Sequence, residues 1–330
     1  MTIVSRIEVP IPFPLKTVNC YYIQDSVPTL IDTGINSKED LNLISGAIKE
    51  KGGSLSDLQR IVLTHGHTDH TGLAGRIEEI IGAKVYIHKW DRHKVFLYGE
   101  KNFEKRIERF HAFLTEAGLS EETVRQVLDT ISRRLSRMVS PLEDIHLLSG
   151  GEQIDFDDFR LEVLHTPGHS SGAICLFNKE NGDLFSGDSL LEKITPNPVV
   201  EIVSPEKNGV YLSIQHYKST LELIKSLPVI QVLPGHGNSF TGHDTRADQI
   251  IAHHRQRKAL VLKILKGYAV KDKKQQGMTG QMVAGYLFPS LEGMDIFLAL
   301  SESIAHLQIL EAEGAVFSDV IDGQRLYNLL

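Results

Sequence analysis

The feature that most restricts the fold is a group of metal-binding residue types, "HGHTDH" at 65–70, directly after the apolar run "IVLT" at 61–64. A zinc-protease helix would space its histidines four apart with a catalytic Glu between them. Here candidate ligands recur at every second position until Asp69, and His70 follows at once. On extended backbone alternate side chains share one side, so Asp69 and His70 join one cluster only if the chain bends. This spacing suits two neighbouring metal ions. The candidate ligands of the stretch are His65, His67, Asp69 and His70.

Three further motifs each place one candidate ligand where a predicted strand runs into a loop. They are "LHTPGHSSGA" at 164–173 with His169, "LFSGDSL" at 184–190 with Asp188, and "VLPGHGN" at 232–238 with His236. Folds that alternate strands and helices gather their sites at strand ends. Coincidence is a poor explanation for seven ligand-type residues at four strand ends, so we expect the four motifs to meet.

Short apolar runs alternate with helical periodicity through most of the chain, which indicates an α/β fold. The N-terminus is typical of a strand, a proline-rich turn and a second strand. Further strands are predicted at 29–34, 60–64, 84–88, 152–156, 159–165, 173–178, 183–186 and 229–237, and helices at 37–53, 72–83, 206–227 and 244–267. A chain of 330 residues can bury a core without disulfides. Cys20 and Cys175 lie in apolar runs, where buried packing is favoured over a disulfide or a metal site.

Residues 91–145 depart from this alternation and predict a helical insertion. Apolar side chains recur three or four positions apart in two stretches, which predicts two amphipathic helices. We expect either a lid over the site or a structural flap without contact to the chemistry. The region contains ten basic and ten acidic residues. This balance favours a solvated helix face over a basic groove that would bind a nucleic acid. The candidate cations for such a groove are Lys105, Arg106, Arg109, Arg133, Arg134 and Arg137.

The C-terminal part, 268–330, reads as a separate annex after a catalytic domain at 1–267. A polar, glycine-containing stretch at 268–280 predicts a linker, followed by two helices at 279–288 and 295–313 and a hairpin around Asp322-Gly323. Helix, helix, hairpin is a winged-helix-like order. A DNA-reading helix carries Lys or Arg, and 291–313 has neither. We therefore expect a packing or homodimer element.

In its motifs the chain resembles the metallo-β-lactamase superfamily, with a glyoxalase II or ribonuclease Z-like motif set. The matching residues are "IDTG" at 31–34, "HGHTDH" at 65–70, "TPGHS" at 166–170, "SGDS" at 186–189 and "PGHG" at 234–237. The resemblance covers roughly residues 1–267 and implies an αββα sandwich with the site at its edge. These motifs in this order are specific for the fold and say nothing of the substrate.

The resemblance also implies how the site is divided. His65, His67 and His169 would hold one metal, and Asp69, His70 and His236 a second, with Asp188 bridging both. Asp32 would either support a ligand or only stabilise its turn. Imidazole ligands favour zinc, and carboxylates make iron or manganese alternatives. Flavin di-iron relatives carry Glu where this chain has His67, which weakens an oxygen-reducing interpretation.

The favoured function is hydrolysis of a small ester, thioester or lactone by a metal-bridging hydroxide, with Asp69 and Asp188 in catalytic roles. The net charge of −7 does not favour nucleic-acid binding. A phosphodiesterase or endoribonuclease using the same metals is the alternative, and a metal-bearing ligand sensor is a third. No run approaches the ~20 apolar residues that span a bilayer, and no signal peptide is recognised. We expect a cytoplasmic enzyme with a small-molecule substrate.

Overall fold

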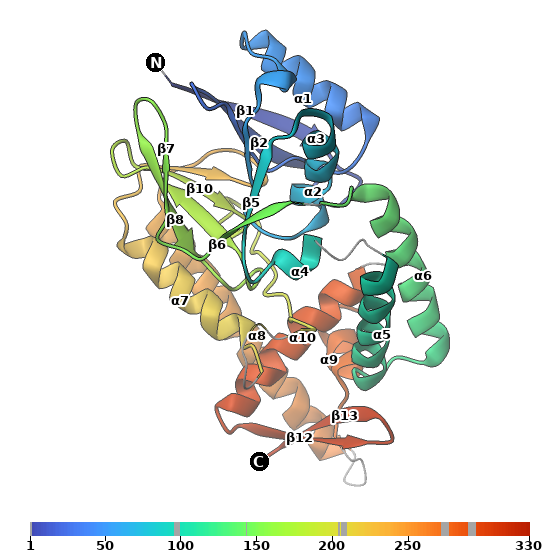
Figure 1. Ribbon diagram of the computed structural model, residues 1–330. Helices are drawn as coiled ribbons and strands as arrows, with labels where there is room; N and C mark the ends of the chain where they lie inside the picture. Colours follow the sequence, from blue (N-terminus) through green and yellow to red (C-terminus); the bar gives the residue numbers. More distant parts are fainter. Residues whose placement is uncertain are drawn as a thin grey trace.

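Two β-sheets packed face to face form the centre of the molecule (Figure 1). The computed structural model describes residues 2–95, 100–142, 144–203, 205, 210–271, 277–289 and 295–330, with only the backbone described at 100–103, 134–136, 271 and 295. The first sheet consists of β1 (Ile3–Pro10), β2 (Thr17–Gln24), β3 (Thr29–Ile31), β4 (Arg60–Val62), β5 (Lys84–His88) and β6 (Ile145–Leu148), in that order. The second consists of β11 (Gln231–Pro234), β10 (Asp183–Gly187), β9 (Ile174–Phe177), β8 (Arg160–His165) and β7 (Gln153–Asp155).

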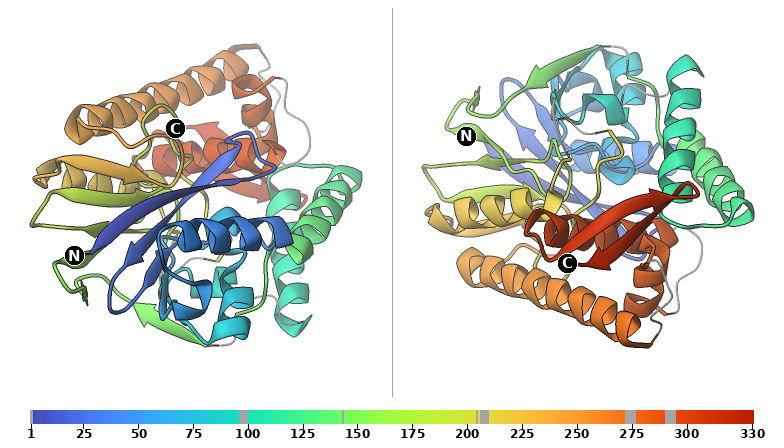
Figure 2. Two further views of the ribbon diagram at one scale, coloured as in Figure 1. Left: turned by 90° about the horizontal axis from the view of Figure 1, so that it is seen from above. Right: turned by 90° about the horizontal axis from the view of Figure 1, so that it is seen from below.

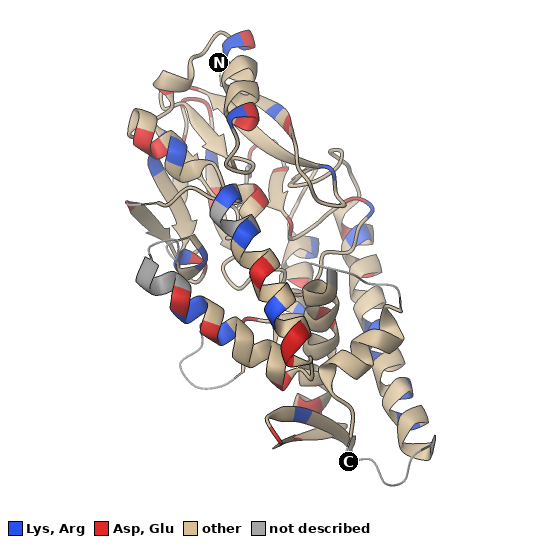
Figure 3. Cartoon of the chain, turned by 90° about the vertical axis from the view of Figure 1, so that its right-hand side faces the viewer, with Lys and Arg blue, Asp and Glu red and all other residues tan. Residues whose placement is uncertain are grey.

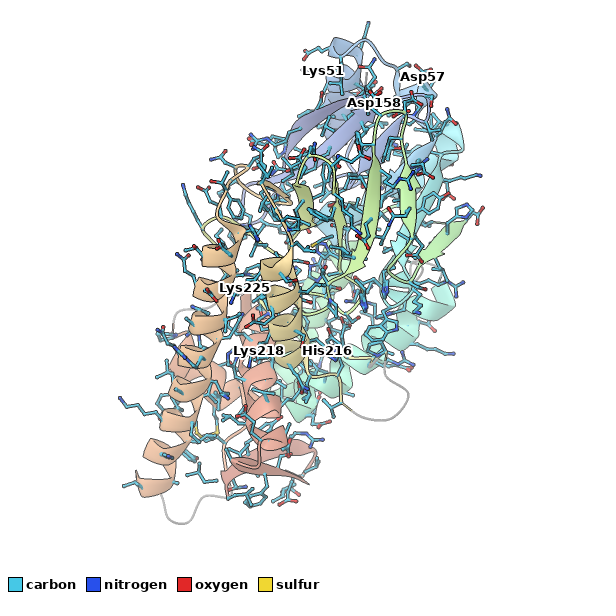
Figure 4. All side chains as sticks on the ribbon, turned by 90° about the vertical axis from the view of Figure 1, so that its left-hand side faces the viewer. Lys51, Asp57, Asp158, His216, Lys218 and Lys225 are labelled. Atoms are coloured by element: carbon cyan, nitrogen blue, oxygen red, sulfur yellow. The ribbon has the colours of Figure 1, made fainter. Side chains whose placement is uncertain are left out.

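Helices cover the outer face of each sheet, which confirms the expected αββα sandwich (Figure 2). On the first sheet lie α1 (Lys38–Glu50) and α3 (Ala74–Ile81). On the second lie α7 (Ser213–Ser226) and α8 (His243–Lys271), side by side in Figure 4 and joined by the Lys225–Asp248 ion pair at 2.6 Å. Among the described residues no helix is both long and apolar enough to cross a membrane.

Burial explains why the central strands are continuous apolar runs. Strands β3, β4 and β5 are mutually parallel, and such strands are covered on both faces. Ile61 packs toward α1 and α3, whereas the adjacent Val62 packs between the sheets against Val163 and Phe185. The run that precedes the histidine cluster is therefore anchored on both sides, which holds the following loop in place.

Several predicted boundaries were wrong, and each difference has a local cause. Strand β6, which was not predicted, begins at Ile145, the last residue assigned to the insertion, and pairs parallel with β5. The predicted helix 72–83 is present as the slightly shorter α3, and the one-turn helix α2 (Thr68–Thr71), which was not predicted, precedes it because the chain turns helical directly after His67. Helix α7 begins at Ser213 rather than 206, and residues 206–209 lie outside the described residues. Helix α8 continues to Lys271, into the predicted linker, of which 272–276 lie outside the described residues.

The insertion and the annex pack against each other. The insertion contains α4 (Arg92–Val95), α5 (Glu100–Glu116) and α6 (Glu121–Met138), with basic and acidic residues interspersed along α5 and α6 (Figure 3). The annex has the predicted order of α9 (Gly280–Leu287), α10 (Asp295–Ala312) and the hairpin β12 (Val316–Ile321) and β13 (Gln324–Leu329). Leu114 and Leu128 of the insertion share one apolar cluster with Leu300 of α10. A winged-helix identity stays a prediction, but the annex is a packing element against the insertion.

Candidate metal centre

The four motif loops bring all seven predicted side chains into one cluster. His65 follows β4, His169 follows β8, Asp188 follows β10 and His236 follows β11. Nitrogen and carboxylate oxygen atoms within 4.8 Å of one another form three groups: His65, His67 and His169; Asp69, His70 and His236; and His65, His70 and Asp188. The first two groups match the division that the family resemblance implied.

The bend in the first motif comes earlier than its spacing suggested. His67 is extended, with φ −77° and ψ 151°, and serves as the N-cap of the one-turn helix α2. Asp69 and His70 therefore lie together on α2, and Asp69 Oδ2 is 3.4 Å from His236 Nε2. The predicted alternation on extended backbone therefore does not reach Asp69, and the chain already bends at 64–66.

Asp188 lies between the two groups. Its Oδ2 is 3.5 Å from His169 Nε2 in the first group and 3.4 Å from His236 Nε2 in the second. Its Oδ1 is 3.5 Å from His70 Nε2 and has no hydrogen-bond partner in the described part of the chain, although it is buried. A buried carboxylate oxygen without a partner is costly unless something pairs with it. This position is what a bridging ligand between two cations requires.

The hydrogen bonds behind the cluster leave its inner nitrogen atoms as lone-pair donors. His70 Nδ1 donates to Asp32 Oδ2 at 2.8 Å, His169 Nδ1 to the Asn197 carbonyl at 2.8 Å, and His236 Nδ1 to the Thr17 carbonyl at 2.6 Å. A neutral imidazole that donates from Nδ1 offers Nε2 as an acceptor or metal ligand. The inner nitrogen atoms nevertheless face one another, with His70 Nε2 3.3 Å from His236 Nε2.

Lone pairs that converge in this way fit metal cations. The buried His65 Nε2 has no hydrogen-bond partner among the described residues, and His67 Nδ1 lies 3.0 Å from His169 Nε2. Imidazole nitrogen and carboxylate oxygen are ligands of zinc and of other first-row divalent metals. The donor set and its outer hydrogen bonds thus form a site that fits such ions.

Charge separates the two groups. Burial lowers the pKa of His67 to about 3, with help from His169 and Lys94, and burial likewise lowers the pKa of His65 and His169. Burial also opposes protonation of His236, but the effect of the Asp188 carboxylate is larger and raises the pKa of His236 to about 10. Burial raises the pKa of Asp188, whereas His236 and His70 bring it well below its usual range. Without a cation the first group is therefore neutral, whereas His236 of the second group carries a proton that a bound cation would displace from Nε2.

Asp32 supports the second group directly. Its buried carboxylate accepts from the Thr64 backbone N–H at 2.8 Å, from Thr64 Oγ1 at 2.7 Å and from His70 Nδ1. Its backbone has φ +57°, a left-handed conformation that few residues other than glycine adopt. Such strain persists where surrounding contacts require it. Of the two roles that the resemblance implied, Asp32 has the supporting one.

Sequence reasoning missed a second charged cluster beside the site. Asp91 is buried and accepts from the Gly66 backbone N–H at 2.7 Å and from the Gly172 N–H at 2.8 Å. Lys94 Nζ lies 3.0 Å from Asp91 Oδ1 and 2.6 Å from Glu201 Oε1. Asp91 therefore ties the first histidine loop to the loop of His169. The signal that could have revealed it is its position, three residues after β5, where the other motif residues also stand.

A pocket of about 360 Å³ opens beside His67 and Thr68. Lys105, Arg106 and Arg109 of α5 line it. Lys105 and Arg109 are exposed, as expected for a solvated face, and Arg106 is half-buried, so α5 forms a solvent-facing wall of the pocket. Arg133 is exposed and pairs with Asp129, Arg137 is exposed, and the side chain of Arg134 lies outside the described residues.

A second cavity of about 680 Å³ lies next to this pocket and extends to the annex. The two share the lining residues Arg109, Val200, Glu201 and Ile202. Most other lining side chains of the larger cavity are apolar, including Phe113 of α5, Leu212, and Ile304 of α10. The annex is also linked to the site loop, because Asn197 Nδ2 donates to the Leu298 carbonyl at 2.9 Å.

Comparisons with known proteins agree with this architecture. The family model of the metallo-beta-lactamase superfamily matches residues 14–236. The "Probable metallo-hydrolase YqjP" of Bacillus subtilis (strain 168) is 29% identical over 320 residues, 96% of this chain and 94% of that protein. The "Acyl-coenzyme A thioesterase MBLAC2" of Gallus gallus is 30% identical over 212 residues, 63% of this chain and 66% of that protein. The crystal structure of a metallo-beta-lactamase family protein from Thermus thermophilus has a TM-score of 0.82 at 29% identity, covering 99% of this chain and 98% of that one.

The matched region contains all seven clustered side chains, and the Bacillus relative also spans the insertion and the annex. The chain therefore belongs to the metallo-β-lactamase superfamily and is a metal-binding hydrolase.

Proposed function

We propose that the chain hydrolyses a small thioester, with esters and lactones as related substrates, at a site for two divalent cations, zinc first among them. The observation that carries the proposal is the pair of ligand groups that share Asp188. Two cations held there would lower the pKa of a bound water and polarise the attacked carbonyl oxygen. Iron and manganese are alternatives for the same ligands.

The roles of the protein groups follow from their contacts. His65, His67 and His169 would hold one cation, Asp69, His70 and His236 would hold the other, and Asp188 would be the ligand that the two groups share. Burial raises the pKa of Asp69, but His70 and His236 outweigh it and keep the carboxyl ionised. Asp69 Oδ2 faces His236, and the side chain is 15% exposed, the largest share among the three carboxylates Asp32, Asp69 and Asp188. These features support our assignment of Asp69 as the group that orients the attacking water and accepts its proton.

Two observations favour a thioester among the acyl substrates. A relative that aligns over 63% of this chain is named an acyl-coenzyme A thioesterase. The apolar cavity beside the pocket has room for an acyl chain, while the pocket itself contacts His67 of the site. The volumes of the pocket and the cavity, about 360 and 680 Å³, are in the range of small-molecule sites.

The experiment combines metal analysis with a substrate panel. Purified protein should contain about two metal ions per chain and hydrolyse acyl-coenzyme A, with lower rates on aryl esters and lactones. Asp188→Asn should lower the rate more than about a hundredfold, because loss of an outer support alone typically costs 10–100-fold. Asp319→Asn is the matched control, since Asp319 is exposed on β12.

The panel also includes single-stranded RNA, because the cations of α5 are what the phosphodiesterase alternative requires. RNA cleavage that Asp188→Asn abolishes, without turnover of any acyl substrate, would overturn the proposal. Fewer than one metal ion per chain in active protein would contradict the dinuclear site.

A further inference from the structure

Three cationic side chains line the pocket beside the metal centre from one helix. Lys105, Arg106 and Arg109 occupy adjacent positions on one side of α5, since residues four apart in a helix are neighbours. His67 and Thr68, from the first histidine motif, line the same pocket. The cations therefore stand beside the site where the reaction is proposed to occur.

These cations lack carboxylate partners in the described part of the chain. No carboxylate oxygen there lies within 4.0 Å of Lys105 or Arg109. Arg106 donates to the Lys94 carbonyl at 3.5 Å, and its guanidinium lies 5.5 Å from the centre of the Phe110 ring. By contrast Lys94, also in the pocket wall, contacts both Asp91 and Glu201.

The other insertion helix is a useful comparison within the same chain. On α6, Arg125 pairs with Glu121 at 3.3 Å, and Arg133 pairs with Asp129, each one turn away. Two basic residues of α6, Arg125 and Arg133, are thus compensated locally, whereas those of α5 that line the pocket are not. In a chain with net charge −7, uncompensated cations gathered at a pocket attract an anionic ligand.

We propose that Lys105, Arg106 and Arg109 form an anion subsite for the phosphate groups on the leaving thiol of a thioester, of which coenzyme A is the model. This inference rests on the proposed function. Arginine binds phosphate through two parallel N–H groups, and lysine adds a point charge. The neighbouring apolar cavity suits the acyl chain, which leaves the cationic wall for the phosphorylated end of the substrate.

The test compares two thioesters with the same acyl chain, one of coenzyme A and one of N-acetylcysteamine, which has the same thioester end but no phosphate. Arg106→Gln/Arg109→Gln should raise KM for the coenzyme A thioester by about 10–100-fold, the effect of losing charge-assisted hydrogen bonds. It should leave kcat/KM for the N-acetylcysteamine thioester within about twofold. Lys105→Gln should act in the same direction, and added salt should raise KM only for the coenzyme A substrate.

Arg255→Gln and Lys218→Gln are matched controls, since both residues are exposed and line neither cavity; Lys218 is labelled on α7 in Figure 4. Equal losses on both thioesters in the α5 variants would indicate a merely structural helix and overturn the subsite. An unchanged KM for the coenzyme A thioester would overturn it as well.

Binding of free coenzyme A, measured by calorimetry, separates this inference from the proposed function. If the protein hydrolyses neither thioester but binds coenzyme A through the α5 cations, the subsite stands and the proposed thioesterase function fails. If it hydrolyses both thioesters alike and does not bind coenzyme A, the function stands and the subsite fails. RNA cleavage that depends on the α5 cations, without coenzyme A binding, would overturn the subsite and indicate that these cations bind RNA.

Discussion

Replacing Asp32 with Asn should disable the second ligand group by changing the tautomer of His70. Oδ1 of Asp32 accepts from the Thr64 backbone N–H, which can only donate, so the Asn carbonyl must take that position. The Asn NH₂ then faces Thr64 Oγ1 and His70 Nδ1, where Asp32 Oδ2 accepted both hydrogen bonds. His70 Nδ1 must become an acceptor, so its proton moves to Nε2. A protonated Nε2 has no lone pair for a cation.

The expected magnitude follows from these contacts. Outer partners of metal-binding histidines contribute 10–100-fold to metal affinity, about 1.4–2.7 kcal/mol. Two hydrogen bonds to a carboxylate, of about 1.5–3 kcal/mol each, become neutral bonds of about 0.5–1.5 kcal/mol each, so the free energy of unfolding should fall by about 2–3 kcal/mol. Asn tolerates the left-handed backbone of residue 32, with φ +57°, so the turn itself is retained.

The assay is metal content after dialysis, followed by competition with a chromophoric chelator at several zinc concentrations. Asp32→Asn should retain one tightly bound ion and bind the other at least tenfold more weakly. Asp40→Asn is the control, because Asp40 is buried in α1 and bonded to Ser37, outside the ligand cluster. A folded Asp32→Asn protein that holds two ions with unchanged affinity would refute the tautomer argument.

Three further changes test other parts of the structure. In Gly235→Ala the added Cβ would lie 2.4 Å from Asp188 Oδ1, so the metal content should fall. In the control Gly46→Ala the added Cβ meets no atom within 4 Å, so the metal content should be retained. Elemental analysis of both proteins tests this difference. Burial lowers the pKa of His254 to about 3 and that of His306 to about 4, from the ordinary value of 6.5. Below pH 6.5 the unfolded chain therefore binds more protons than the folded chain. As the pH falls, the free energy of unfolding should decrease by up to about 1.4 kcal/mol per pH unit for each of the two histidines. Urea unfolding at pH 6.5 and 5.5 should show a smaller loss in His254→Leu, and an equal loss would refute this assignment. Chelation should lower the unfolding temperature, and added zinc should restore it, because cations that bind only the folded state stabilise it; calorimetry showing no shift would contradict the site.

Much of the site could be predicted because its chemistry is local. The seven ligand residues stand in short motifs at strand ends, and the strands are recognisable from apolar runs that are buried on both faces. The division into two groups came from the family resemblance. Spacing alone misplaced Asp69, because alternation assumes extended backbone and the chain turns helical directly after His67.

The environment of the site could not be predicted in the same way. Lys105, Arg106 and Arg109 look like an ordinary charged helix face in sequence, since acidic residues alternate with them. Asp91 and Lys94 meet Glu201 from a distant segment of the chain, and none of the three belongs to a recognised motif. Strand β6 escaped notice because its pairing with β5 spans the whole insertion.

The sequence by itself determined which side chains can bind metal and in which order they approach the sheet edge, because residue type and strand periodicity act over a few positions. Only the tertiary structure decided that α5 turns its cations toward the pocket and that α10 supports the loop of His169 through Asn197. The physical reason is that the partner of a helix face is set by packing between distant segments, which no local pattern records.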